Sequence, residues 1–203
     1  MKLKRNLNRR EFVFAGTVAL AVPLLGCGGK AVAERLESAG SWKAVIVSDS
    51  EPGQPMIVSG RIFAPDGKTP LEGITLFVYQ TDASGVYSTR GGNGDNRNTR
   101  IHGSMRTNAD GQYEFRTIKP GSYPQSRNPA HVHAFVSGPG YPEYWIDEFL
   151  FDDDPFVGND LRNRVSNKGT FSSVLKLTKG NDGILRGVRD IVIEHCSKNC
   201  TGR

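Results

Sequence analysis

Short apolar runs separated by turn-forming residues dominate the chain from about residue 51 onward. The runs are rich in β-branched or aromatic side chains, which is typical of β-strands, and Gly, Pro, Asn and Asp fill the gaps between them. We expect strands at 57–64, 74–80, 112–118, 130–137, 143–151, 171–178 and 188–194. Because few segments show a helical period, this pattern predicts an all-β fold, either a sandwich or a barrel.

The segment 1–26 follows a different pattern. Five basic residues precede an apolar run from Phe12 to Gly26, which is typical of a signal peptide and too short to span a bilayer as a stable helix. The pair Arg9 and Arg10 resembles a twin-arginine export signal, and the letters LLGC ending at Cys27 resemble a lipoprotein cleavage box. We therefore expect export to a bacterial cell envelope, as a periplasmic protein or as a lipoprotein anchored to the membrane through Cys27. An ordinary thiol near a simple cleavage site is the alternative for Cys27.

Removal of this signal peptide changes the charge of the chain. The full chain carries a net charge of +5, and segment 1–26 holds five Lys or Arg against one acid, so the remainder carries +1. That balance does not indicate a nucleic-acid partner. We assign residues 27–50 to a lipid-anchored tether and linker, and residues 51–203 to a single domain.

Two further cysteines, Cys196 and Cys200, lie near the C-terminus. In an oxidising compartment, two cysteines this close in sequence favour a disulfide, provided that a turn brings their Cα atoms within reach. We therefore expect a disulfide between them rather than a metal site.

The stretch 119–133 concentrates the candidate chemistry. His131 and His133 form an H-x-H pair in an expected strand, so both side chains would project from the same face as candidate metal ligands. Two ordinary histidines would give the same pattern. Tyr123 precedes them in a Pro-Gly-Ser turn, from which a loop would carry its phenol over that face. Tyr87, at the end of an expected strand, supplies a second phenol.

Two other polar segments have simpler interpretations. The long irregular segment 88–107 carries four arginines against one acid, and it is either a solvated loop or a functional one. The run Asp152, Asp153 and Asp154 lacks the alternating oxygen ligands of a calcium loop, so we expect a solvated turn.

Taken together, these residues resemble the intradiol ring-cleavage dioxygenases, the family of the catechol and protocatechuate dioxygenases. The similarity covers roughly residues 51–194 and is carried by segments 59–88, 110–124, 129–133 and 150–156. It implies a β-sandwich of the intradiol dioxygenase core type with long active-site loops. It also implies non-haem Fe(III), held by Tyr87, Tyr123, His131 and His133, with Tyr123 as the ligand that leaves the metal when substrate arrives.

The chemistry of this donor set agrees with that metal. Phenolate oxygen suits a hard, highly charged cation better than it suits zinc or copper(I). A free tyrosine titrates near ~10, so only a strongly charged ion would hold two phenolates at neutral pH. Copper or zinc in place of iron remains an alternative that metal analysis would detect.

Three positions depart from the family pattern. The family has an arginine three positions before its first histidine, where this chain has Asn128, with Arg127 one position earlier. Either a bulge returns Arg127 to the pocket, or the guanidinium is absent. Glu148 stands where the family commonly has glutamine, and Gln125 where it often has tryptophan. We assign catalytic roles to Tyr123 and Arg127, and substrate contacts to Arg127, Asn128 and Glu148.

The first functional hypothesis is an enzyme that uses O₂ to cleave a catechol-type ring between its two hydroxyls, giving a muconate-type diacid. The alternative is a membrane-tethered β-sandwich binding module whose iron site is idle or non-catalytic. The pattern G-R-I-F…P-L-E-G also resembles transthyretin-like accessory domains, which supports this alternative.

Overall fold

The computed structural model describes residues 40–88, 97, 99–164 and 169–194. The expected signal peptide, Cys27, most of the tether, and the pair Cys196 and Cys200 lie outside the described residues, so export, lipidation and the disulfide stay predictions. Within the described ranges, no helix is long and apolar enough to cross a membrane.

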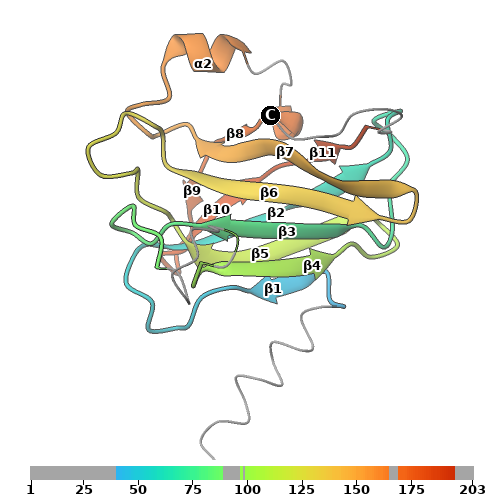
Figure 1. The fold of residues 1–203 in the computed structure, drawn as a ribbon, viewed down its shortest axis with the longest axis horizontal. Helices are drawn as coiled ribbons and strands as arrows, with labels where there is room; N and C mark the ends of the chain where they lie inside the picture. The colour runs from blue at the N-terminus through green and yellow to red at the C-terminus, as the bar shows by residue number, and fades with distance from the viewer. Residues whose placement is uncertain (1–39, 89–96, 98, 165–168, 195–203) are drawn as a thin grey trace, which may run out of the picture.

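Two β-sheets form the described part of the chain, with β3, β6 and β7 in front of β2 and β10 (Figure 1). The larger sheet contains β1 (Lys43–Val45), β5 (Gln112–Ile118), β2 (Pro55–Phe63), β10 (Leu185–Val188) and β9 (Thr178–Lys179) in that order, and β11 (Ile191–Val192) also pairs with β2. The smaller sheet has the order β4 (His102–Arg106), β3 (Thr75–Gln80), β6 (His131–Gly138), β7 (Tyr141–Phe151) and β8 (Val174–Leu175). Short helical segments are α2 (Asn159–Arg164) and η2 (Gly169–Phe171). The predicted β-sandwich is confirmed.

The core lies between the two sheets and determines which side chains face outward. In β6, Val132, Ala134 and Val136 are buried against the core, while His131 and His133 are only partly buried. Each fully buried apolar side chain of this kind contributes roughly 1.5–3 kcal/mol to stability, so the inward face fixes the register of the strand. As a result, the two histidines lie together on the outer face of the smaller sheet.

Two elements differ from the sequence expectations. Strand β1 lies within the segment that we assigned to the linker, so that assignment is wrong for Lys43–Val45, which pair with β5. Strand β4 lies within the segment 88–107, which we expected to be irregular throughout. Both strands are short, and β4 contains one buried apolar side chain, Met105, so neither gives a clear periodic signal.

Near the C-terminal end of the described chain, the expected strands are shorter than the apolar runs. The run 171–178 contains only β8 and the start of β9, and the run 188–194 is divided between the end of β10 and β11. The division occurs at Arg189, whose backbone N–H donates to the carbonyl oxygen of Ser59 (2.9 Å).

Candidate metal centre

The loops that carry Tyr87 and Tyr123 are bonded to each other. The Thr81 hydroxyl donates to the carbonyl oxygen of Gly121 (2.9 Å), and the Gly121 N–H donates to the carbonyl oxygen of Asp82 (2.9 Å). A Cβ atom added at Gly85 would lie 1.8 Å from the carbonyl oxygen of Ser122, so only glycine allows the loops to approach this closely. The two tyrosines are therefore brought together by contacts between their loops that do not involve their phenols.

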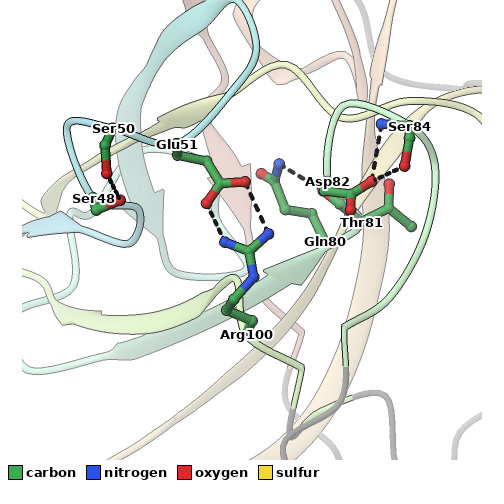
Figure 2. A network of polar contacts seen from close by, with 8 residues as sticks. All are labelled: Ser48, Ser50, Glu51, Gln80, Thr81, Asp82, Ser84 and Arg100. Carbon is green, nitrogen blue, oxygen red and sulfur yellow. Dashed lines mark hydrogen bonds and ion pairs between the residues drawn. The ribbon is translucent and has the colours of Figure 1, made fainter.

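The turn before Tyr87 is closed by a single carboxylate. Asp82 Oδ1 accepts hydrogen bonds from the Ser84 N–H (2.9 Å), the Ser84 hydroxyl (2.6 Å) and the Val86 N–H (3.1 Å). Figure 2 shows Asp82 and Ser84 beside the buried Gln80 at the end of β3. The Gln80 side chain donates to the carbonyl oxygen of Ile118 (2.9 Å). This bond links the ends of β3 and β5, the strands that precede the two loops.

Two arginines of segment 88–107, Arg97 and Arg100, pair with acidic side chains. Arg100 forms a two-bond ion pair with Glu51, drawn in Figure 2, and its N–H donates to the carbonyl oxygen of Ser88. Arg97 lies 3.4 Å from a carboxylate oxygen of Glu143. Arg100 therefore anchors the segment that follows Tyr87.

Tyr123 begins a tight turn. The Ser126 N–H donates to the carbonyl oxygen of Tyr123 (3.1 Å), Pro124 occupies the first central position, and Gln125 has φ 61°. Proline followed by a positive φ is the pattern of a type II turn. A non-glycine residue in this region costs roughly 1–2 kcal/mol, and such strain persists only where the surrounding structure imposes it.

The two phenols and two imidazoles expected to bind metal converge on one point. Tyr123 Oη lies 2.8 Å from Tyr87 Oη, 3.0 Å from His131 Nε2 and 3.3 Å from His133 Nε2. The two Nε2 atoms are 3.0 Å apart. Among the described residues, no three His, Cys, Asp or Glu side chains form a group that could hold a metal, so the phenols are necessary members of this site.

The separations between donor atoms in this cluster are those of metal ligands, and its protons are too few to satisfy every donor atom with a hydrogen bond. Ligand atoms bound to one ion at about 2.0–2.1 Å lie about 2.8–3.4 Å from one another, which matches the four separations. His131 Nδ1 lies 2.7 Å from the Pro129 carbonyl oxygen, so Nδ1 carries the proton and Nε2 presents a lone pair to the cluster. One Tyr123 hydroxyl cannot donate to both imidazoles at once. A cation at the centre would satisfy all four atoms.

Burial favours the neutral forms of Tyr87 and His133 in the absence of a cation. Burial, together with the hydrogen bond to Tyr123, raises the pKa of Tyr87 well above its usual range, so this phenol stays protonated at neutral pH. Burial and the nearby His131 lower the pKa of His133 to about 4, so its imidazole is neutral and available as a ligand. Only a strongly charged ion would displace the phenolic protons.

Aromatic side chains hold the second histidine in place. The Tyr79 ring stacks on the His133 ring at 4.6 Å with an angle of 19° between the planes, and Trp145 packs edge-on at 5.5 Å. Because these rings contact both a face and an edge of the imidazole, they restrict its rotation.

Asp154 is a positioning residue that the sequence interpretation missed. We expected it in a solvated turn, but it is buried, and that prediction is wrong. Its carboxylate accepts from the N–H of Ala130 (2.9 Å) and of Phe156 (2.8 Å), and from the Ser122 hydroxyl (3.4 Å). Ala130 and Ser122 each precede a candidate ligand by one position, so a single carboxylate fixes both ligand-bearing segments. The triple Asp run concealed this role, because its composition is that of a surface turn.

The three expected substrate-contact residues occupy different places. Arg127 and Asn128 are exposed and line a cavity of about 490 Å³ together with Pro129, Phe156 and residues 158–161. In the described part of the chain, no hydrogen bond or ion pair joins either residue to the four-residue cluster. Glu148 is closer, with a carboxylate oxygen 3.7 Å from His133 Nδ1. Their contacts with substrate remain predictions.

Comparison with known proteins agrees with this geometry. Residues 37–188 match the family model described as Dioxygenase. The chain belongs to this family. Its relatives include catechol 1,2-dioxygenase 1 of Acinetobacter lwoffii, which is 30% identical over an alignment of 131 residues; the match covers 57% of this chain and 42% of that protein. The protocatechuate 3,4-dioxygenase beta chain of Burkholderia cepacia is 31% identical over an alignment of 123 residues, and the match covers 56% of this chain and 52% of that protein.

A solved structure extends the comparison of this dioxygenase-family chain to its fold. The dioxygenase domain of a dioxygenase carbohydrate-binding protein fusion from Streptomyces sp. SirexAA-E superimposes with a TM-score of 0.58 and 26% identity. The match covers 77% of this chain and 89% of that one. By contrast, the chain spans about half the length of the curated relatives it matches. The predicted resemblance to intradiol dioxygenases is confirmed at the level of the family.

Proposed function

We propose that this dioxygenase-family chain binds non-haem Fe(III) and cleaves a catechol-type aromatic ring between its two hydroxyls, using O₂, to give a muconate-type diacid. The observation that carries this proposal is the convergence of Tyr87, His131 and His133 on Tyr123, whose Oη lies 2.8–3.3 Å from the other three donor atoms. Export to the bacterial cell envelope, with Cys27 as a lipid anchor, is proposed from the sequence alone.

The donor set favours ferric iron over other metals. Two phenolates supply two negative charges, and with neutral imidazoles they suit a trivalent ion better than zinc or copper(I). Bound there, Fe(III) would act as a Lewis acid that binds the catechol oxygens and makes the ring reactive toward O₂.

The position of each ligand indicates which one gives way to substrate. His131 and His133 lie in β6, a central strand of the smaller sheet, so they cannot move without disturbing the core. Tyr87 follows a turn closed by Asp82 and is partly buried. Tyr123 leads into a turn whose next two residues, Pro124 and Gln125, are exposed. We therefore assign to Tyr123, and not to the strand-borne histidines, the role of the ligand that gives way to substrate.

A displaced Tyr123 has a chemical role. A phenolate oxygen is a proton acceptor, so the Oη of a displaced Tyr123 is a suitable base for a catechol hydroxyl. Because Tyr123 Oη lies within 3.3 Å of the other three donor atoms, it remains close to any oxygen that takes its place. Tyr79 and Trp145, packed on His133, limit the access of water from that side.

The visible spectrum of the purified protein, with iron quantified on the same sample, tests this proposal first. A broad phenolate-to-iron band that moves to longer wavelength on anaerobic addition of catechol would support a tyrosinate site with room for substrate. Oxygen consumption with formation of a diacid, measured on a panel of neutral and anionic catechols, would then identify the reaction. A protein that stays colourless after ferric loading would contradict the iron site.

The binding module remains the second candidate because, in the described part of the chain, no hydrogen bond or ion pair joins Arg127 or Asn128 to the cluster. Iron binding and colour without oxygen consumption on the whole catechol panel would favour it over the enzyme.

A further inference from the structure

A β-bulge beside the candidate metal centre directs a carboxylate toward one ligand. Strands β6 and β7 pair Val132 with Phe149 and Ala134 with Ile146, so Asp147 and Glu148 both stand opposite His133. A bulge of this kind bends the strand locally and changes which face a side chain occupies. Phe149 and Ile146 face the core, whereas Glu148 reaches the outer face, where the histidines lie.

The atom that Glu148 approaches lacks a partner. His133 Nδ1 is buried and has no hydrogen-bond partner among the described residues. Glu148 Oε1 lies 3.7 Å away, slightly too far for a hydrogen bond. The Glu148 side chain is 47% exposed, so it is free to close the remaining few tenths of an ångström by a small torsion. The stacked Tyr79 ring holds the imidazole so that Nδ1 stays on this side.

The contacts within the four-donor cluster do not determine which ring nitrogen of His133 carries the proton. A proton on Nε2 would be donated to His131 Nε2, 3.0 Å away, and would block His133 as a ligand. An ionised carboxylate accepts hydrogen bonds and cannot donate them, so a carboxylate beside Nδ1 favours the tautomer with the proton on Nδ1. For His131, the Pro129 carbonyl oxygen selects the same tautomer.

We propose that Glu148 is a positioning residue for His133: its carboxylate accepts a hydrogen bond from Nδ1–H, which leaves Nε2 free for the metal, and it places a negative charge behind that ligand. This inference rests on the proposed iron site and assigns Glu148 to the ligand instead of to the substrate. Partners of this kind orient metal-bound histidines and make them stronger donors. The added negative charge stabilises the ferric state and makes it a poorer acceptor of electron density from tyrosinate.

Three variants separate the hydrogen bond from the charge. Glu148→Gln keeps an oxygen that accepts a hydrogen bond from His133 Nδ1–H and removes the charge, while Glu148→Ala removes both. Glu143→Gln is the matched control, because it removes a carboxylate from the same strand at an exposed position that pairs with Arg97 instead of His133.

The first readout needs no metal. Long-range ¹H–¹⁵N spectra of the metal-free protein report which ring nitrogen of His133 carries the proton. We expect Nδ1–H in the wild type, Glu148→Gln and Glu143→Gln, and a shift of the population toward Nε2–H in Glu148→Ala. An unchanged tautomer in Glu148→Ala would overturn the proposal.

The second readout uses ferric protein. We expect Glu148→Ala to lower the ferric affinity, measured by competition with a chelator, by about 10–100-fold. We expect Glu148→Gln to retain most of the affinity, with its charge-transfer band at longer wavelength than in the wild type, and Glu143→Gln to change neither property. A wild type that binds no iron would defeat the proposed function, whereas a coloured wild type with unaltered Glu148 variants would defeat only this inference.

Discussion

Replacing Asp154 tests whether one buried carboxylate holds both ligand-bearing segments together. In Asp154→Ala, the N–H groups of Ala130 and Phe156 and the Ser122 hydroxyl lose their acceptor. The Ala130 N–H is buried, so leaving it unsatisfied costs about 1–3 kcal/mol, and the Phe156 bond adds roughly 0.5–1.5 kcal/mol. We expect a total loss of about 2–4 kcal/mol, a large part of the 5–15 kcal/mol typical of a domain.

The neighbouring residue supplies the control. Asp153 carries the same charge, and its exposed carboxylate pairs with Lys119 Nζ at 2.6 Å, an arrangement worth about 0–1 kcal/mol at a surface. Asp153→Ala should therefore have little effect. In Asp154→Asn, the amide oxygen accepts a hydrogen bond from one of the two backbone N–H groups, whereas the amide nitrogen cannot accept from the other. We therefore expect an unfolding free energy between those of the wild type and Asp154→Ala.

Urea unfolding of the metal-free protein measures the stability, and the ferric spectrum measures the site. We expect Asp154→Ala to have a lower unfolding free energy and a weakened or shifted phenolate-to-iron band, because both Tyr123 and His131 lose support. The reasoning would be refuted if Asp154→Ala matched Asp153→Ala within about 0.5 kcal/mol and kept the wild-type band.

Three further predictions concern the site and its surroundings. Tyr87→Phe removes one phenolate and the 2.8 Å hydrogen bond to Tyr123, so we expect weaker ferric binding, a weaker visible band and loss of activity. The control is Tyr144→Phe, because the Tyr144 hydroxyl accepts from the Glu194 N–H; it should keep the ferric binding, the band and the activity. Gln125→Gly relieves the positive φ, and we expect a gain of about 0.5–1 kcal/mol in urea unfolding, since the relief exceeds the entropy cost of glycine; a loss would mean that the Gln125 side chain stabilises the turn. The folded-state pKa of His133, about 4, lies below its unfolded value near ~6.5, so the unfolded chain takes up the proton first as the pH falls. Metal-free protein should therefore keep this contribution above pH 6.5 and lose on the order of 1–3 kcal/mol between pH 6.5 and pH 4, and His133→Asn should remove that part of the pH dependence in thermal unfolding.

The sequence was most informative where local pattern and burial agree. The alternation around His131 and His133 predicted a strand with both imidazoles on one face, because the intervening Val132 must be buried. The turn residues around Tyr123 predicted a loop, and the proline within it matches the turn in the structure. These features depend on neighbours in the sequence, so a single sequence is sufficient to predict them.

Features that depend on distant partners were missed. The Asp154 carboxylate bonds to an N–H that is 24 positions away, and nothing in the Asp run distinguishes it from its exposed neighbour Asp153. The bulge that directs Glu148 toward His133 arises from the pairing of β6 with β7, which has no local signature. Strand β1 was assigned to a linker because three residues carry too little pattern to identify an edge strand.

The two faces of β6 make the length of this strand harder to change than its composition. Substitution at Val132 or Ala134 by another apolar residue of similar size would preserve both faces. Insertion or deletion of one residue between His131 and His133 would turn one imidazole into the core and one apolar side chain toward the proposed metal site. In natural variation or laboratory evolution of this chain, we therefore expect substitutions throughout β6 but length changes only in the loops that flank it.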